Sequence, residues 1–323
     1  MNILVTGCAG FIGFHLCKTL NENKKNKVYG IDNLNNYYDV KLKNKRLDIL
    51  KKSKNFCFYK IDIKNIIKLE KNFNANKYDI VINLAAQAGV RHSINNPKTY
   101  LDSNIIGFFN VLEVCRNNNI KHLIFASTSS VYGDSKKFPL KEEYNTDRPM
   151  SFYAATKKSN EVMAYSYSYI HKLKITGLRF FTVFGPFGRP DMALFKFTKA
   201  IFENKKIHLY NNGNHIRDFT YIDDLISMII KIINKPPNKK IPFEIFNMAN
   251  SQPTKLLKFI SEINKYLNKR IKFKKMPMQL GDVKKTHAHT AKINNVIKKD
   301  KKTKLNIAIY NFIEWYKDYH KIK

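Results

Sequence analysis

Short apolar runs alternate with longer stretches of helical spacing over the first 181 residues of the chain. Runs typical of buried strands occupy residues 3–6, 28–31, 56–59, 80–84, 122–126 and 175–181. Helical spacing follows the first run as far as Leu20 and returns over residues 104–118 and 151–171. Because strands that alternate with helices form parallel sheets covered on both faces, the pattern predicts an α/β fold with a doubly wound parallel sheet.

The pattern loosens after residue 181, where Gly-Pro turns and shorter elements predict a second, smaller lobe. Residues 219–233 and 243–248 have the spacing of a helix and a strand that return to the first sheet, and the Lys/Asn stretch at 234–240 predicts an exposed loop. We therefore expect a Rossmann-type domain over residues 1–181 with returning segments at about 217–248. A smaller C-terminal α/β lobe would comprise residues 182–216 and 249–323.

The composition adds a large positive charge, since 58 Lys and Arg residues against 25 Asp and Glu give a net charge of +33. Such a charge is typical of nucleic-acid-binding proteins. Here, however, lysine is scattered among asparagine and isoleucine, and no zinc-finger spacing or RNA-binding aromatic motif accompanies it. We interpret the charge as a solvated surface without a nucleic-acid partner, which would still attract a polyanionic small substrate.

Other features of the sequence favour a cytoplasmic protein without a membrane partner. It has no run of about 18 apolar residues and no basic, apolar leader at its start. The four cysteines form no C-x-x-C pair, which favours reduced thiols. His287 and His289 lie close together in THAHT (286–290), but without a third ligand they predict no metal site.

A glycine-rich turn, TGCAGFIG (6–13), lies between the first strand and the first helix. Its three glycines would allow a tight turn, the approach of a pyrophosphate and close packing of helix on strand. The helix N-terminus would offer free N–H groups to the phosphates. Asp32 ends the second strand about 20 residues later, where a carboxylate binds the ribose diol of NAD and repels the additional phosphate of NADP. The turn and Asp32 together predict a site for NAD.

Two acidic residues near this site have alternative interpretations. Asp32 could be a turn residue before Asn33, and Asp62 could either bond the adenine amine or cap the next helix. We expect the cofactor to contact Gly7, Gly10, Phe11, Ile12, Gly13, Asp32, Asn33, Asp62, Ile63, Leu84, Ala85, Ala86, Asn104, Tyr153 and Lys157.

Tyr153 and Lys157 stand four residues apart in SFYAATKK (151–158), so they share one face of the predicted helix. An isolated tyrosine has a pKa near 10 and is a poor base at neutral pH. A neighbouring ammonium group and a nicotinamide ring would lower that pKa. The same spacing also arises by chance in ordinary amphipathic helices, but here it follows a dinucleotide turn.

Four hydroxyl residues follow the fifth strand in FASTSSVYG (125–133). Because the carboxyl ends of strands in such sheets point at the ligand crevice, these hydroxyls would emerge there. We expect Thr128 to bond the substrate hydroxyl and relay its proton to Tyr153, with Ser129 and Ser130 in contact with sugar or backbone. The alternative is that the hydroxyls only terminate the strand.

The glycine spacing G-x-x-G-x-x-G, together with these motifs, resembles the extended short-chain dehydrogenase/reductase superfamily. Nucleotide-sugar dehydratases of that superfamily carry Thr-Asp-Glu where this chain has Thr128-Ser129-Ser130. Related decarboxylases have an acid just before Val-Tyr-Gly, where this chain has Ser130. Since no carboxylate occurs from 125 to 133, what remains is reversible hydride transfer at one carbon, which is epimerisation.

Four more segments resemble the UDP-glucuronate 4-epimerases of bacterial capsule and lipopolysaccharide pathways: NLAAQAGVR (83–91), DSNIIGFFN (102–110), RFFTVFGPFGRPDMALFKF (179–197) and RDFTYIDD (217–224). The resemblance covers nearly the whole chain, to FIEWYKDY (312–319). It implies reversible C4 epimerisation of UDP-glucuronate to UDP-galacturonate through a transient 4-keto sugar, with a tightly bound, recycled NAD and with Thr128, Tyr153 and Lys157 as catalytic residues. It also implies a homodimer formed through helices 104–118 and 153–171.

The resemblance assigns residues to the substrate as well. Thr182 and Arg189 would grip the uronate carboxylate, and Arg217 would hold the diphosphate. The full expected set is Arg91, Ser129, Ser130, Thr182, Arg189 and Arg217. Gln279 lies where galactose epimerases commonly have arginine, which leaves one phosphate contact unassigned. The alternatives are a 4-epimerase of neutral UDP-sugars, such as UDP-glucose or N-acetyl forms, and a non-catalytic dinucleotide sensor on the same fold.

Overall fold

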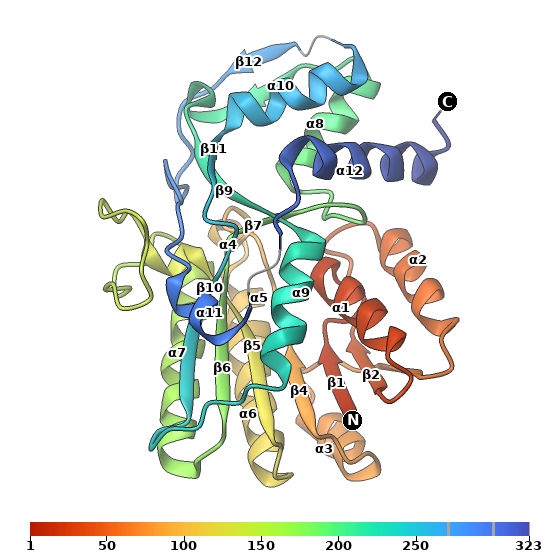
Figure 1. Cartoon of the computed structure of the whole chain (residues 1–323), viewed down its shortest axis with the longest axis vertical. Coiled ribbons are helices and arrows are strands. Elements are labelled where there is room, and N and C mark those ends of the chain that lie inside the picture. Colours follow the sequence, from red (N-terminus) through yellow and green to blue (C-terminus); the bar gives the residue numbers. More distant parts are fainter. Residues whose placement is uncertain (270–271, 299–300, 323) are drawn as a thin grey trace.

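A seven-stranded sheet in which all neighbouring strands are parallel forms the centre of the computed structural model, which describes residues 1–269, 272–298 and 301–322 (Figure 1). The strand order is β10-β6-β5-β4-β1-β2-β3. This arrangement confirms the predicted doubly wound α/β fold. The strands are β1 (Asn2–Thr6), β2 (Lys27–Asp32), β3 (Phe56–Lys60), β4 (Ile80–Asn83), β5 (His122–Thr128), β6 (Ile175–Phe180) and β10 (Phe243–Met248).

Helices cover both faces of this sheet, so successive residues of a central strand enter different cores. In β1, Ile3 and Val5 pack into one core and Leu4 into the other. The first core includes α1 (Phe11–Glu22), α2 (Val40–Lys51) and α9 (Ile222–Ile233). The second includes α3 (Ile66–Ala75), α6 (Gly107–Asn117) and α7 (Phe152–His171). Both faces of the central strands are therefore buried.

A smaller group of elements lies beyond one end of the sheet, in the upper part of Figure 1. It contains a three-stranded sheet in the order β11-β9-β7, a two-stranded sheet and three longer helices. Phe219 stacks on Phe259 at 4.3 Å between ring centroids within it. The division of the chain into two domains stays a prediction. The elements are β7 (Thr182–Phe184), β8 (Ile207–Leu209), β9 (Ile216–Tyr221), β11 (Pro253–Lys255), β12 (Phe273–Lys275), α8 (Ala193–Phe202), α10 (Leu256–Leu267) and α12 (Leu305–His320).

Two expected helices differ from their sequence pattern at the start. Residues 216–221 form β9, which pairs with β7 and β11, so the helix expected from residue 219 begins at Ile222. The segment expected to be helical from residue 104 is helical there, but as a π-helix, η1 (Leu101–Ile106), which continues into α6 at Gly107. In the described part of the chain, no helix combines the length and apolarity needed to cross a membrane. The remaining short elements are α4 (His92–Asn95), α5 (Pro97–Tyr100), η2 (Ser129–Tyr132), η3 (Tyr210–Gly213) and α11 (Ala291–Val296).

Candidate active site

The glycine turn joins β1 to α1 and leaves the start of that helix open. Gly7 has a φ of +73°, and a Cβ atom there would lie 2.8 Å from the backbone nitrogen of Ala85. A Cβ atom on Gly13 would lie 2.1 Å from the carbonyl oxygen of Gly7, so only glycine allows α1 to pack this closely. Gly10 precedes α1 without a side-chain cap. The first N–H groups of the helix are therefore available to a phosphate.

Asp32 is fixed at the end of β2 by two backbone amides. Its Oδ2 accepts from Ala9 N at 3.1 Å, and its Oδ1 accepts from Leu34 N at 2.8 Å. The residue is 8 % exposed, and burial raises the pKa of its carboxyl group. It also lines the main cavity. Asp32 thus makes the turn contact that we considered as an alternative, and at the same time presents a carboxylate to a ligand.

Asp62 links the ends of β2 and β3. Its Oδ2 accepts from Asn33 Nδ2 at 3.0 Å, and its Oδ1 accepts from Lys64 N at 3.0 Å. The cap of α3 is Asn65, whose Oδ1 accepts from Lys68 N, so Asp62 is not the cap residue. Both Asp62 and Asn33 line the cavity, and the adenine contact of Asp62 stays a prediction.

A cavity of about 260 Å³ runs along the carboxyl ends of the strands. The glycine turn lines one part of it, and Tyr153 and Arg189 line another. The turn with its free helix amides, the carboxylate of Asp32 and the apolar wall after β4 form a site that NAD fits. The predicted residues on its walls are Gly7, Gly10, Phe11, Ile12, Gly13, Asp32, Asn33, Asp62, Ile63, Leu84, Ala85, Ala86, Thr128, Tyr153, Lys157 and Arg189.

Three of these side chains, Thr128, Tyr153 and Lys157, come together from β5 and α7. Ser151 caps α7 by accepting from Ala154 N at 3.2 Å, so Tyr153 lies in the first turn of the helix and Lys157 in the second. Thr128 ends β5, and its Oγ1 accepts from Ser130 N at 3.2 Å. The three line one cavity, as the sequence motifs predicted.

The electrostatics of Tyr153 differ from expectation. Burial raises the pKa of its phenol, while a hydrogen bond with Thr128 and the charge of Arg189 act to lower it. Lys157, which we expected to lower this pKa, is not among the groups that do so. Its Nζ atom donates to Asn160 Oδ1 at 3.3 Å on its own helix. Burial also lowers the pKa of Lys157 to about 8.

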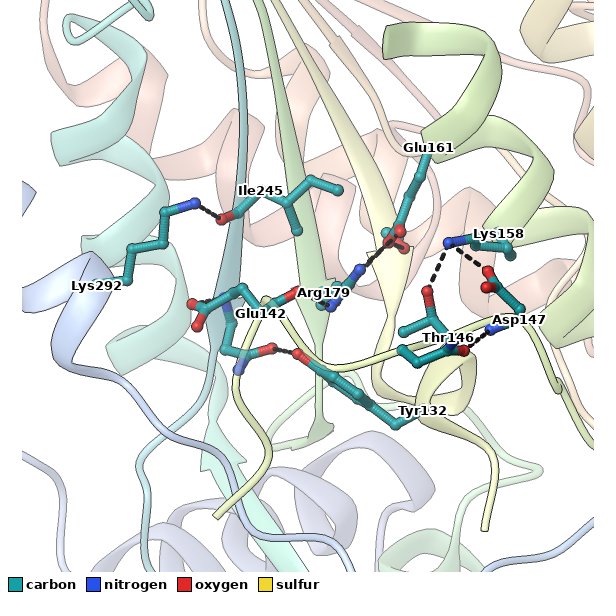
Figure 2. Close-up of polar contacts among 12 residues, drawn as sticks. Tyr132, Glu142, Thr146, Asp147, Lys158, Glu161, Arg179, Ile245 and Lys292 are labelled. Carbon is teal, nitrogen blue, oxygen red and sulfur yellow. Dashed lines mark hydrogen bonds and ion pairs between the residues drawn. The ribbon is translucent and has the colours of Figure 1, made fainter. Parts of the chain in front are cut away.

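A buried ion pair behind the catalytic face joins α7 to β6. Arg179 donates from Nε and Nη2 to the two carboxylate oxygens of Glu161 at 2.9 and 2.8 Å, and Figure 2 shows the two side chains facing each other. Both side chains are 4 % exposed. Ser127 donates to Glu161 Oε1 at 2.5 Å, which fixes the end of β5 beside Thr128. The sequence analysis missed this pair, although Glu161 continues the four-residue spacing of Tyr153 and Lys157.

The same ion pair is embedded in further polar contacts. Arg179 lies over the ring of Tyr132, 4.8 Å from its centroid, and donates from Nη1 to the Glu142 carbonyl at 3.1 Å. The Tyr132 hydroxyl donates to Asn247 Oδ1 at 2.7 Å on β10 (Figure 2). Desolvating two charges is costly unless their hydrogen bonds are satisfied, and these contacts satisfy them. These contacts hold α7, β5, β6 and β10 together behind the cavity.

Six predicted residues lie outside the wall of the main cavity: Asn104, Ser129 and Ser130, and also Arg91, Thr182 and Arg217, which are described below. Asn104 is buried, donates to Gln87 O and Thr156 Oγ1 at 3.0 Å each, and accepts from Gln87 N at 2.8 Å. It therefore holds the wall in place from behind. Ser129 and Ser130 begin the short helix η2, and the Thr128 hydroxyl donates to Ser130 Oγ at 3.2 Å. Ser127 lines the cavity instead.

The end of the site where the sugar is expected is built around the segment that follows β6. Arg189 lines the main cavity and is paired with Asp191, from Nη2 to Oδ2 at 2.6 Å. Thr182 lines an adjoining cavity of about 20 Å³, which shares Arg189 and Phe11 with the main one. Thr182 and Arg189 therefore lie on the same side of the site.

Positive side chains gather near this end. Arg217 donates to Asp282 Oδ1 at 2.8 Å, and Arg91 lies over the ring of Tyr210 at 4.9 Å. Burial lowers the pKa of Arg217, and Arg91 lowers it further against the effect of Asp282. Burial and the charges of Arg91 and Arg189 also lower the pKa of Lys196 on α8. Sequence analysis missed Lys196, whose only signal was its place in DMALFKF.

Comparisons with known proteins agree with this geometry. The family model described as the NAD dependent epimerase/dehydratase family matches residues 3–249. Protein CapI of Staphylococcus aureus is 46% identical over 335 residues, which cover 99% of this chain and 100% of that protein. The probable UDP-glucuronate 4-epimerase of Rhizobium meliloti is 40% identical over 331 residues, or 98% of this chain and 97% of that protein.

A solved structure is similar over the same length. The crystal structure of UDP-glucuronic acid 4-epimerase from Bacillus cereus, in complex with UDP-glucuronic acid and NAD, matches with a TM-score of 0.93 and 32% sequence identity. The match covers 99% of this chain and 100% of that one.

Proposed function

The chain belongs to the NAD dependent epimerase/dehydratase family, and on that basis we propose that it catalyses reversible C4 epimerisation of UDP-glucuronate to UDP-galacturonate. The enzyme is an NAD-dependent isomerase. The single observation that carries the proposal is one cavity that brings Thr128, Tyr153 and Lys157 together with Arg189, beside a phosphate-binding turn. Hydride chemistry and recognition of an acidic sugar can therefore occur in the same place.

Thr128 and Tyr153 would handle the proton of the C4 hydroxyl. NAD, when bound, supplies the hydride acceptor for C4 and, once reduced, the donor. Tyr153 takes the hydroxyl proton directly or through Thr128, whose Oγ1 is fixed by the amide of Ser130 at 3.2 Å. Lys157, 3 % exposed on the same face of α7, would help to hold the cofactor. Tyr153 returns the proton when the C4 centre is reduced again from its other face.

The carboxylates of the cavity support epimerisation over elimination. Among the described residues that line it, only Asp32 and Asp62 are acidic, and both lie at the ends of β2 and β3, on the side of the expected adenosine. Elimination from the sugar needs a further acid and base near C5. Tyr153 and Thr128 alone suit removal and return of one hydroxyl proton.

Inversion requires the sugar to turn while the rest of the substrate stays held. We assign the diphosphate to Arg91, Lys196 and Arg217, because Arg91 lies close enough to lower the pKa of both Lys196 and Arg217. Guanidinium groups offer paired donors to phosphate oxygens. Such a grip would let the sugar rotate about its link to the diphosphate.

The uronate carboxylate could be lost as carbon dioxide during the reaction, and Arg189 and Thr182 would prevent this loss. A ketone at C4 makes the sugar a β-keto acid, which loses carbon dioxide readily when the C5–C6 bond aligns with the carbonyl π system. A guanidinium group that holds the carboxylate can keep this bond out of alignment. Arg189 lines the cavity in a position that supports this role.

The decisive experiment is incubation of the purified protein with UDP-glucuronate and no added NAD. We expect UDP-galacturonate to appear, because the cofactor is regenerated in each turnover and would stay bound. Parallel reactions with UDP-glucose and UDP-N-acetylglucosamine test the alternative of neutral substrates. Rapid epimerisation of a neutral sugar with no reaction of UDP-glucuronate would overturn the proposal.

We also propose that the enzyme is a homodimer that serves polysaccharide synthesis in the cytoplasm. Support for the dimer comes from apolar side chains on the surface of η1, α6 and α7, where a four-helix interface was expected. They include Leu101, Ile106, Phe109, Val162, Tyr165 and Tyr169, which are 44 to 57% exposed. Support for the compartment comes from Cys8, Cys17 and Cys115, which are buried free thiols.

A further inference from the structure

Arg189 is held by a carboxylate that does not face the main cavity. Its Nε and Nη2 atoms donate to Oδ1 and Oδ2 of Asp191 at 3.0 and 2.6 Å. Among the described residues that line the cavity, Arg189 is present and Asp191 is not. This bidentate pair fixes the plane of the guanidinium group and leaves Nη1 as the edge open to a ligand.

Asp191 is in turn held by Tyr37. The Tyr37 hydroxyl donates to Asp191 Oδ2 at 3.1 Å, and its ring lies 5.9 Å from the guanidinium carbon of Arg189. The ring packs edge-on against His92, with 4.9 Å between centroids. Burial opposes ionisation of Asp191, but Arg189 and Tyr37 outweigh it and keep the pKa of Asp191 below its usual value.

Tyr37 connects this contact to the cofactor end of the site. It lies in the segment after β2 that also carries Asn33 and Asn35, and all three residues line the cavity. Lys43 of α2 donates to the Asn35 carbonyl at 2.6 Å, which anchors the segment. The loop beside the expected adenosine therefore also sets where Arg189 can point.

We propose that Asp191 and Tyr37 are positioning residues that aim Nη1 of Arg189 at the sugar carboxylate and thereby set the preference for uronates over neutral sugars. The inference rests on the proposed function, since it needs a substrate with a carboxylate. Neither residue has to touch the substrate. Their effect is to hold the side chain of Arg189 in one rotamer before the substrate binds, so this side chain loses little conformational entropy on binding.

The alternative is that Asp191 competes with the substrate. Its carboxylate would then bind Arg189 until the sugar carboxylate displaces it. The geometry favours positioning. Asp191 does not line the cavity, it engages both Nε and Nη2 of Arg189, and the hydroxyl of Tyr37 holds it there. The two relationships predict opposite changes in affinity when the charge of Asp191 is removed.

The test compares binding of UDP-glucuronate and UDP-glucose by calorimetry on protein loaded with NAD. We expect D191N to weaken UDP-glucuronate about tenfold and Y37F about threefold, as for loss of one charge-assisted and one neutral hydrogen bond, with UDP-glucose within about twofold of wild type. In steady state the KM for UDP-glucuronate should rise more than kcat falls. D191E should recover part of the loss.

Y38F is the matched control for Y37F, because the neighbouring hydroxyl contacts Arg46 Nη1 at 2.7 Å and not Asp191. It should leave the ratio of the two affinities unchanged. Tighter binding of UDP-glucuronate by D191N, or equal weakening of both ligands by D191N and Y37F, would overturn the inference. Failure of wild-type protein to epimerise UDP-glucuronate would instead overturn the proposed function.

Discussion

Lys157 and Glu161 lie on successive turns of α7, and the Glu161 carboxylate opposes the effect of burial on the pKa of Lys157. Burial lowers the pKa of Lys157 to about 8, and the carboxylate of Glu161 acts to raise it. Arg179 and Ser127 hold that carboxylate in place at 2.9 and 2.5 Å. The charge state of a residue on the cavity wall thus depends on an ion pair that lies behind the wall.

Removing the Glu161 charge should therefore change the pH profile of the reaction. In E161Q the pKa of Lys157 falls further, so the ammonium is lost at lower pH. We expect the alkaline limb of kcat against pH to move down by about one unit. The measurement is kcat between pH 6 and pH 10, with circular dichroism to check the fold. The double variant E161Q/R179M, which leaves no unpaired guanidinium, controls for that second charge, and an unmoved limb in both would contradict the prediction.

Tyr153→Phe removes the proposed base and keeps the ring. We expect kcat to fall by about 10³-fold, within the usual range for loss of a general acid–base group. Y100F is the matched control, because Tyr100 packs edge-on against Tyr153 at 6.1 Å and its hydroxyl donates to the Gly89 carbonyl at 2.6 Å. The control should keep most of its turnover. Near-normal activity of Y153F would remove Tyr153 from the mechanism.

Arg189→Ala should lower epimerisation and release a pentose by-product. Without the guanidinium group the carboxylate is free to align with the C4 ketone, so decarboxylation competes with reduction. Chromatography of the nucleotide-sugar products measures both outcomes in one run. R116A, which removes an arginine paired with Glu113 on the outer side of α6, is the control. Unchanged rates and no pentose in R189A would refute its carboxylate role.

The buried side chain of His122 should make the folded protein less stable in acid. It is 1 % exposed, with its ring nitrogens 3.0 Å from the Ile233 carbonyl and 2.8 Å from Thr176 Oγ1. Burial lowers its pKa to about 4 in the folded protein. Its neutral form therefore stabilises the fold above pH 6.5, and this contribution is lost as pH falls from 6.5 to 4, by up to about 3 kcal/mol.

The check is urea unfolding of wild type and H122Q at pH 7.5 and pH 5. The variant should be less stable than wild type at pH 7.5, and the gap should close or reverse at pH 5. His15 also has a pKa lowered to about 4 by burial, whereas burial raises that of Asp218 to about 6, so only the difference between the two proteins isolates His122. An equal gap at both pH values would contradict the prediction.

The apolar surface of α7 should mediate dimer formation. Val162 and Tyr169 are both 57% exposed, so charged substitutions there leave the core intact. We expect wild type to elute with the mass of two chains in light-scattering chromatography, and V162E/Y169E with the mass of one. I67E replaces an apolar residue that is 74% exposed on α3 and should leave the mass unchanged. A monomeric wild type would rule out the dimer.

The fold could be predicted largely because each strand of a parallel sheet has a local sequence pattern, a short apolar run. The strands at 56–60 and 243–248 coincide closely with their patterns. The start of α9 was misplaced because Phe219, which lies in β9, stands at helical spacing (i, i+3, i+7) from Ile222 and Ile226 of the helix. Pairing with β7 and β11 makes residues 216–221 a strand, and the local sequence does not show which distant segments will pair.

The site divides in the same way. The glycine turn and the pair Tyr153 and Lys157 are short-range patterns with a fixed spacing, and they line one cavity as predicted. The contacts of Asp191 with Tyr37 and of Glu161 with Arg179 join residues that are far apart in the sequence. Whether a charged side chain finds a partner depends on the tertiary fold. For this reason the groups that tune the site were missed. Most of the residues expected to bind the cofactor do line the cavity, but other wall residues, among them Asn35, Tyr37 and Ser127, were not predicted.

The pairing of β6 with β10 has a consequence for how the protein is made. On the ribosome, β6 is complete at residue 180, but the partner that covers its free side begins only at Phe243. At the usual rate of about 5–20 residues per second, the nascent chain exposes an apolar, unpaired strand edge for several seconds. Early termination before residue 243 would make that edge permanent, so truncated products should aggregate or recruit chaperones.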